Sequence, residues 1–175
     1  MEVTTQCDGT RGRTAGFFLP LYGTTQCIYN SRKKSHTMFE FHRNERARQL
    51  RPSLSRSWLL VRANSSEEVF EEAFESEADS IIIDLEDGCP AEEKDAAREQ
   101  VVRMLNSGVV AWVRINAITT EHWWKDVKAL KNVKGLRGVM LATAEHATDI
   151  DRTAAELPPG TPIIALIESA LGVHH

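Results

Sequence analysis

Several apolar segments of this chain run directly into charged or amide residues, and no other feature limits the possible folds as strongly. Each segment has the length of one β-strand, and its polar residues come where that strand would end. Because parallel strands bring their carboxyl ends to one edge of a sheet, these polar side chains are expected to meet there, as in α/β enzymes. The three clearest segments are residues 81–87, 112–116 and 163–168.

Charge separates the first 56 residues from the rest of the chain. Residues 1–56 hold ten Lys and Arg against four Asp and Glu, whereas residues 57–175 hold eleven against twenty-one. The first part has no sustained helical or strand period, so we expect a basic, disordered extension there. The second part is expected to fold as one domain, because the chain is 42% hydrophobic.

The second part alternates predicted strands with predicted helices. Ser65, with Glu68 three residues later, forms a capping-box pattern, and the helix that follows would bury a face containing Val69 and Phe74. Thr120 is the expected N-cap of a later helix. We expect strands at 58–61, 80–85, 109–115, 138–141 and 162–167, and helices at 66–76, 90–105, 121–130 and 147–157.

This alternation with short loops predicts an α/β fold with a parallel sheet and right-handed crossovers. A doubly wound sheet and a TIM (β/α)8 barrel both satisfy the pattern. No Gly-x-Gly-x-x-Gly motif follows the first strand, which weakens a dinucleotide-binding interpretation. Polar residues at the ends of successive strands favour the barrel, here a partial one of about five strands and four helices.

Composition argues against several classes of partner. No segment approaches the roughly 18 apolar residues of a membrane span. The three cysteines, Cys7, Cys27 and Cys89, form no disulfide framework, which fits a reduced, cytoplasmic setting. Arginines in the first part are more typical of a basic tail than of a nucleic-acid site. We therefore expect neither a membrane nor a nucleic acid as partner.

Four short motifs occur in the order in which one protein family carries them. They are Arg-Ser-Trp-Leu-Leu-Val at 56–61, Asp-Leu-Glu-Asp-Gly at 84–88, Val-Arg-Ile-Asn at 113–116 and Ile-Glu-Ser-Ala-Leu-Gly at 167–172. Through these motifs, residues 56–173 resemble the HpcH/HpaI aldolase and citrate lyase β-subunit superfamily. Four spaced motifs are far more specific than any one of them.

The resemblance implies a TIM barrel that breaks or forms a carbon–carbon bond beside a carbonyl, with a divalent cation, usually Mg²⁺. Its substrates would be 3-hydroxyacyl thioesters, such as citryl, malyl or citramalyl esters of coenzyme A or acyl carrier protein. Its products would be an acyl thioester and a 2-oxo acid. Full-length members are expected to be homo-oligomers.

The resemblance also assigns roles to four residues. Glu168 would be a metal ligand that also contacts the substrate, and Arg114 would clamp the carboxylate of the oxo acid. Glu86 and Asp87 would lie beside the metal and act with Arg114 as catalytic residues. The chemistry of these side chains agrees, because Mg²⁺ prefers oxygen ligands and a guanidinium fork binds a carboxylate through two parallel hydrogen bonds.

Structural roles remain open for the same side chains. Arg114 could form an ion pair with Asp87 that only stabilises the fold. Asp84 is better explained as a buried, hydrogen-bonded residue than as a catalyst. Asp84 and Glu86 share one strand face by the period of two, so their repulsion would raise the pKa of one of them.

Two departures from the family pattern bear on activity. Thr143 stands where the family carries a Lys, which removes one cation from the predicted site. A complete barrel needs about 250 residues, and the family's second metal ligand, an Asp in a later strand, is missing. We therefore expect a C-terminally truncated chain with weak activity or none.

Two other functions remain open. A pyruvate-class aldolase with the same fold would act on free 4-hydroxy-2-oxo acids, although the pair Glu86 and Asp87 favours the thioester. A non-catalytic fragment would instead use its exposed strand edges to bind another protein.

Overall fold

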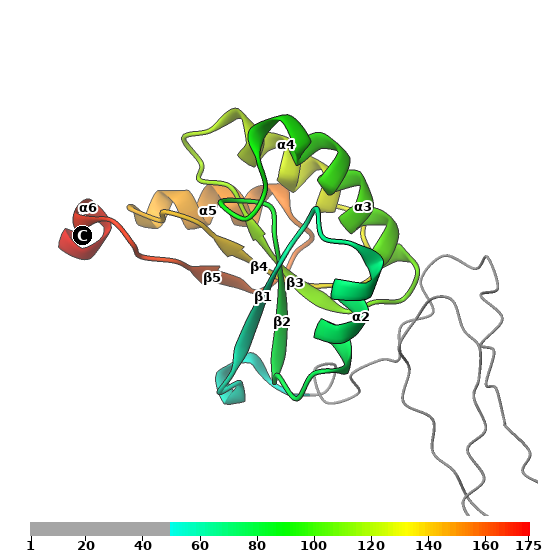
Figure 1. Ribbon diagram of the computed structural model, residues 1–175. Helices are drawn as coiled ribbons and strands as arrows, with labels where there is room; N and C mark the ends of the chain where they lie inside the picture. The colour runs from blue at the N-terminus through cyan, green and yellow to red at the C-terminus, as the bar shows by residue number, and fades with distance from the viewer. Residues whose placement is uncertain (1–49) are drawn as a thin grey trace, which may run out of the picture. The chain divides into compact units, whose positions relative to one another are not determined.

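The computed structural model describes residues 50–175, which form one sheet with helices packed on one of its faces (Figure 1). The elements in chain order are η1 (Pro52–Leu54), β1 (Trp58–Arg62), α2 (Glu67–Glu75), β2 (Ser80–Asp84), η2 (Ala91–Glu93), α3 (Lys94–Asn106), β3 (Ala111–Ile115), α4 (Glu121–Leu130), β4 (Leu136–Leu141), α5 (Ala147–Glu156), β5 (Ile163–Ala165) and α6 (Ala170–His174).

Only the last residues of the expected N-terminal extension can be compared with the structure, because residues 1–49 lie outside the described range. Residues 50–56 include the short helix η1. Arg56 is held by Asp79, whose Oδ2 accepts hydrogen bonds from the Arg56 backbone N–H at 2.9 Å and from Nε at 3.1 Å. This carboxylate therefore ties the residues just before β1 to the start of β2.

All pairings in the sheet are parallel, and the strands lie in the order β1-β2-β3-β4-β5. Each strand therefore lies beside the strand that follows it in the sequence. A doubly wound sheet would reverse this order at a switch point, whereas a barrel winds in one direction throughout. The α/β fold with five parallel strands is confirmed, and its winding is that of a partial barrel.

One face of the sheet and the helices share a single apolar core. Alternate strand residues point into it, as the two-residue period of a strand requires. Burial of this apolar surface supplies the main stabilisation of the fold. The strand members include Val61, Ile81, Ile83, Val113, Ile115, Val139 and Leu141, and the helix members include Phe70, Phe74, Val101, Leu105, Val127 and Leu130.

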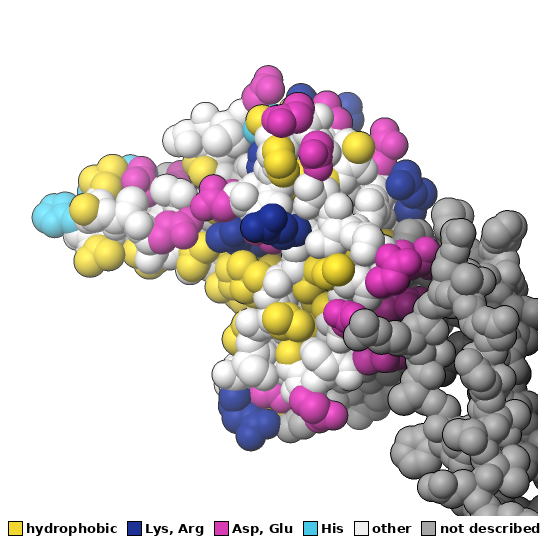
Figure 2. Space-filling view, viewed as in Figure 1, with side chains coloured by type: hydrophobic (Ala, Val, Ile, Leu, Met, Phe, Trp, Pro, Cys, Tyr) yellow, Lys and Arg dark blue, Asp and Glu magenta, His cyan; other side chains and the backbone are white. Residues whose placement is uncertain are grey.

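The opposite face carries Leu60, Ile82, Trp112 and Gly138, which lie in register across four strands. Leu60 is 47% exposed, and Figure 2 shows hydrophobic side chains gathered over this part of the sheet. Trp112 is buried and lies directly over Gly138, where an added Cβ would come within 2.3 Å of the indole ring. This is the face that a barrel turns inward.

The helices differ in detail from the sequence prediction. The predicted cap Ser65 is wrong: α2 begins one residue later, at Glu67, with Ser66 as its N-cap. Val69 is exposed, because the buried face of α2 consists of Phe70, Ala73 and Phe74. The prediction for Thr120 is confirmed, since its hydroxyl accepts a hydrogen bond from the Trp123 N–H.

A fifth α-helix, α6, was not predicted. It is only five residues long, and its N-cap is Ser169, whose hydroxyl accepts a hydrogen bond from the Gly172 N–H at 3.0 Å. So short a helix has too few residues to show an amphipathic period. Among the described helices, none has the length and apolar composition needed to cross a membrane.

Candidate functional site

Arg114 and Asp84 form the centre of the site, at the carboxyl ends of neighbouring strands β3 and β2. The two residues are register partners. Arg114 donates from Nε to Asp84 Oδ1 at 2.7 Å and from Nη2 to Oδ2 at 2.6 Å. Asp84 also accepts hydrogen bonds from the backbone N–H groups of Glu86 at 2.9 Å and Gly88 at 2.8 Å. The interpretation of Asp84 as a buried structural residue is thus supported.

Glu86 approaches Arg114 from the loop after β2. Its Oε2 lies 3.3 Å from Arg114 Nη1, and the Glu86 side chain is partly buried. Asp87, beside it, is exposed. Arg114 thus forms its ion pairs with Asp84 and Glu86. The predicted structural ion pair between Arg114 and Asp87 is wrong in its partner.

The two carboxylates beside Arg114 have opposite pKa shifts. Burial by itself would raise the pKa of Asp84, but hydrogen bonds from Arg114 and two backbone amides outweigh it and lower the pKa below its ordinary value. Burial raises the pKa of Glu86 above its ordinary value, and the charge of Asp87 adds to this effect. The predicted repulsion between Asp84 and Glu86 is thus not the cause.

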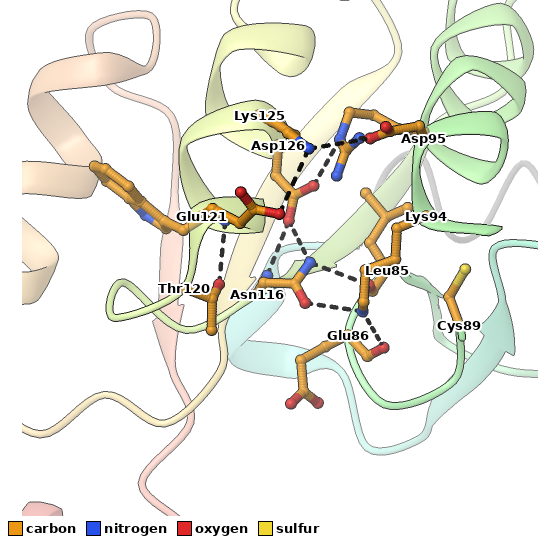
Figure 3. Close-up of polar contacts among 12 residues, drawn as sticks. Leu85, Glu86, Cys89, Lys94, Asp95, Asn116, Thr120, Glu121, Lys125 and Asp126 are labelled. Atoms are coloured by element: carbon orange, nitrogen blue, oxygen red, sulfur yellow. Dashed lines mark hydrogen bonds and ion pairs between the residues drawn. The ribbon is translucent and has the colours of Figure 1, made fainter. Parts of the chain in front are cut away.

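Lys94 supports the loop that carries Glu86 (Figure 3). This lysine is buried at the start of α3, and its Nζ donates to the carbonyl oxygens of Leu85 and Glu86, both at 2.6 Å. A third bond, of 2.9 Å, reaches Asn116 Oδ1. The ammonium therefore connects the end of β2 to the end of β3.

Asn116 extends this network toward α4. Its Nδ2 donates to Asp126 Oδ2 at 2.7 Å, and its backbone N–H donates to the same oxygen at 3.0 Å. The other oxygen of Asp126 accepts a hydrogen bond from Arg98 Nε at 2.8 Å, and Arg98 in turn pairs with Asp95 at 2.6 Å. The loops after β2 and β3 are thereby fixed by buried charges on α3 and α4.

The strand-end pattern does not predict this network, although the sequence contains a signal for it. Lys94 and Arg98 fall, at intervals of three and four residues, on the same face of α3 as the buried Ala97 and Val101. Asp126 lies in the same way on the buried face of α4. Charged residues at helical positions that are otherwise apolar indicate a buried, paired network.

Glu168 follows β5 and binds the loop after β4. Its Oε1 accepts hydrogen bonds from the Thr143 N–H at 2.9 Å and from Thr143 Oγ1 at 3.2 Å. Thr143 has a φ of 48°, which is rare for a β-branched residue. β4 separates β5 from β3 in the sheet, so Glu168 and Arg114 come from strands that are not neighbours. Of the four predicted site residues, Glu86 and Arg114 are in contact with each other, whereas Glu168 contacts Thr143.

Glu168 is also the candidate metal ligand. Within residues 50–175, no three His, Cys, Asp or Glu side chains are grouped as a metal site. However, Mg²⁺ in enzymes is commonly held by one or two carboxylates, with waters and substrate oxygens completing its coordination. Glu168 is exposed, and among residues 50–175 its carboxylate accepts hydrogen bonds from the uncharged N–H and hydroxyl of Thr143, so it fits the role of one such ligand.

Similar proteins are found among family models, curated proteins and solved structures. The profile of the HpcH/HpaI aldolase/citrate lyase family matches residues 56–175. A (3S)-malyl-CoA thioesterase of Cereibacter sphaeroides is 33% identical over 119 residues, which cover 66% of this chain and 41% of that protein. A citrate lyase subunit beta of Leuconostoc mesenteroides is 39% identical over 111 residues, which cover 55% of this chain and 36% of that protein.

Solved structures agree with these matches. CitE of Mycobacterium tuberculosis, crystallised with magnesium and acetoacetate, is 30% identical, with a TM-score of 0.60 over 71% of this chain and 49% of that chain. The chain spans less than half the length of each curated relative named above.

Proposed function

The chain belongs to the HpcH/HpaI aldolase/citrate lyase family, and we propose that its site acts in cleaving a carbon–carbon bond of a 3-hydroxyacyl thioester of coenzyme A. The observation that carries this proposal is the orientation of Arg114 at the carboxyl end of β3. Related proteins include an L-malyl-CoA/beta-methylmalyl-CoA lyase of Cereibacter sphaeroides, 33% identical over 124 residues. Malyl thioesters are therefore the first substrates to test.

Arg114 is the group that would bind the substrate's carboxylate. Asp84 engages Nε and Nη2 along one edge of the guanidinium and fixes its plane. The edge formed by Nη1 and Nη2 still has N–H groups to donate, since a guanidinium carries five. A carboxylate bound there would receive two parallel hydrogen bonds, an arrangement that a lysine cannot supply.

Glu86 is the group that would move a proton. Its Oε2 lies 3.3 Å from Arg114 Nη1, so a carboxylate bound to Arg114 would bring its hydroxyl-bearing carbon close to Glu86. Cleavage requires removal of the carbinol proton and delivery of a proton to the thioester enolate. A carboxyl whose pKa is raised by burial is better suited to both steps than an ordinary glutamate. Asp87 contributes by adding negative charge beside it.

Glu168 would hold a divalent cation, for which Mg²⁺ is the first candidate because CitE of Mycobacterium tuberculosis was crystallised with it. When bound, such an ion supplies Lewis-acid polarisation of the carbinol oxygen. Thr143, through its two hydrogen bonds to Oε1, would orient the Glu168 carboxylate.

The experiment is a product analysis with malyl-CoA and Mg²⁺. Carbon–carbon cleavage gives acetyl-CoA and glyoxylate, whereas hydrolysis of the thioester consumes water and gives malate and free coenzyme A. The hydrolytic alternative is included because one relative is a malyl-CoA thioesterase. Glyoxylate formation, even at a low rate, supports the proposal, and release of the free thiol without glyoxylate contradicts it.

Two matched variants test whether turnover depends on Glu86 in particular. Glu86→Gln keeps the size of the side chain but cannot take up a proton, and we expect it to lower turnover about 100-fold or more. Glu99→Gln changes an exposed glutamate of α3 and should leave turnover unchanged. Equal activity of both variants would exclude Glu86 as the proton carrier.

A further inference from the structure

Two histidines from distant parts of the chain meet beside the loop that precedes α5. His146 is the N-cap of α5, and His175 follows α6. Their Nδ1 atoms are 2.8 Å apart, and their ring centroids are 4.4 Å apart. Both residues are exposed. Figure 2 shows histidine side chains, in cyan, at the left edge, where Figure 1 places α6.

The hydrogen between the two rings can be assigned from a third contact. His175 Nδ1 also lies 3.2 Å from the carbonyl oxygen of Glu145, which can only accept a hydrogen bond. His175 Nδ1 therefore carries the hydrogen, and His146 Nδ1 accepts it with its lone pair. A neutral imidazole can move its single N–H from Nδ1 to Nε2 without any change of charge. Both Nδ1 lone pairs could then reach one ligand, once the His146 ring releases the Asp149 N–H that it accepts in the capping box of α5.

The backbone around the pair is held in place by other contacts. Ser169 Oγ donates to Glu145 Oε1 at 2.7 Å, which ties the start of α6 to the loop before α5. Gly172 packs so closely that an added Cβ would lie 2.7 Å from the carbonyl oxygen of Ala144. These contacts mean that the two imidazoles are brought together by the fold rather than by their own attraction.

The charges nearby suit a cation. The carboxylate of Asp149 accepts hydrogen bonds from the backbone N–H groups of Glu145 at 3.2 Å and His146 at 3.0 Å, so it offsets the positive end of α5. Glu145 adds a second carboxylate in the same loop. The first turn of α5 is therefore not an anion site, and a positive ion at His146 is not repelled by the helix.

We propose that His146 and His175 form a two-histidine site for a divalent transition-metal ion, Cu²⁺ above all and Ni²⁺ next. The 2.8 Å between the Nδ1 atoms places both donors within reach of one ion, with metal–nitrogen bonds of about 2.0 Å. Copper is named first because imidazole sites bind Cu²⁺ more tightly than Ni²⁺ or Zn²⁺ in the general affinity order of these ions. Rotation of the exposed rings turns both lone pairs toward one ion, and water completes the coordination.

This site is separate from the proposed magnesium ligand Glu168 in its donor atoms as well as its residues. Imidazole nitrogens favour copper and nickel, whereas Mg²⁺ takes oxygen ligands. Metal binding would also cross-link α6 to the loop before α5, across 29 residues of chain. The hydrogen exchange of the α6 amides should therefore slow when metal is added.

The test is a titration of the full chain with Cu²⁺, at a pH where imidazole is neutral. Calorimetry measures the affinity, and electron paramagnetic resonance identifies the ligand atoms. We expect a Cu²⁺ site with two equatorial nitrogens in the spectrum, and we expect this signal to disappear when either histidine is replaced. Replacement of His146 or His175 by Ala should weaken binding about tenfold or more, since each removes one of two nitrogen ligands. All variants change exposed side chains, and circular dichroism checks that they fold.

His174→Ala is the matched control. The His174 ring lies 5.6 Å from the His175 ring, but no contact joins it to His146. We expect this variant to bind Cu²⁺ within about twofold of the parent chain. Unchanged affinity in His146→Ala and His175→Ala, or an equal loss in His174→Ala, would overturn the proposal. Because the probe is the metal alone, the result is independent of any lyase activity.

Discussion

Asp84 engages two nitrogen atoms of Arg114, Nε and Nη2, so the guanidinium presents only its remaining edge at the end of the strands. Both side chains are largely buried, with 6% of Asp84 and 12% of Arg114 exposed. The pair therefore has two consequences. It stabilises the fold, because neither charge is left unpaired, and it orients the group that we propose to bind substrate.

Asp84→Asn is expected to destabilise the protein by about 3 kcal/mol, because it removes the bidentate partner of the buried Arg114 and leaves the more distant Glu86, 3.3 Å away, facing that charge. Urea unfolding measures this change in the free energy of unfolding. Asp87→Asn alters the exposed neighbour and should stay within about 0.5 kcal/mol of the parent chain. Equal stability of the two variants would contradict the structural role of Asp84.

The contribution of Asp84 to stability should be lost in acid. Its pKa in the folded state lies below the ordinary value of 3.8, so the stabilisation is present above that value and disappears as the pH falls through the lower, folded pKa. The stability difference between the parent chain and Asp84→Asn should thus be constant from pH 7 to about pH 5 and shrink below about pH 4. A difference that is unchanged at pH 2 would show that the carboxylate charge is not its source.

Lys94→Met tests the support of the loop after β2. The variant removes three hydrogen bonds and leaves the carbonyls of Leu85 and Glu86 without this donor. We expect a loss of about 3 kcal/mol and faster hydrogen exchange of the amides at 86–88. Lys128→Met, on the exposed side of α4, should change neither quantity. Normal exchange at 86–88 in Lys94→Met would mean that the loop holds its shape alone.

Gly138→Ala tests the packing of the apolar face that the helices leave uncovered. The added methyl group would meet the Trp112 ring at 2.3 Å and the carbonyl oxygen of Pro162 at 2.7 Å. We expect destabilisation of about 2 kcal/mol in thermal or urea unfolding. Substitution of Trp112 by Leu in the same chain should reduce this cost. Wild-type stability in Gly138→Ala would show that the strands shift apart freely.

Much of the fold follows from local patterns in the sequence. The strands and the longer helices were predicted because each contains enough apolar residues to show its period, and Thr120 was identified because capping chemistry is local. The start of α2 was wrong by one residue because Ser65 and Ser66 are equally good caps in sequence. α6 was missed because its start depends on contacts of Ser169 with residues far away in the chain.

The site was less predictable than the fold. The pairing of Arg114 with Asp84 depends on strand register, which sequence patterns do not specify here. The position of Glu168 against Thr143 depends on the conformation of two loops, one of them with a positive φ. The Lys94 network was missed because each of its charged residues looks solvated until tertiary contacts bury it.

The most direct test of the central claim measures binding of a small 2-oxo acid, with glyoxylate or pyruvate as probe, in the presence of Mg²⁺. Arg114→Lys keeps the positive charge beside Asp84 but loses the planar fork, and Arg103→Lys makes the same change on the exposed side of α3. We expect saturable binding by the parent chain and by Arg103→Lys, weakened about tenfold or more in Arg114→Lys. Unchanged affinity in Arg114→Lys would contradict the proposal that this guanidinium receives the substrate carboxylate.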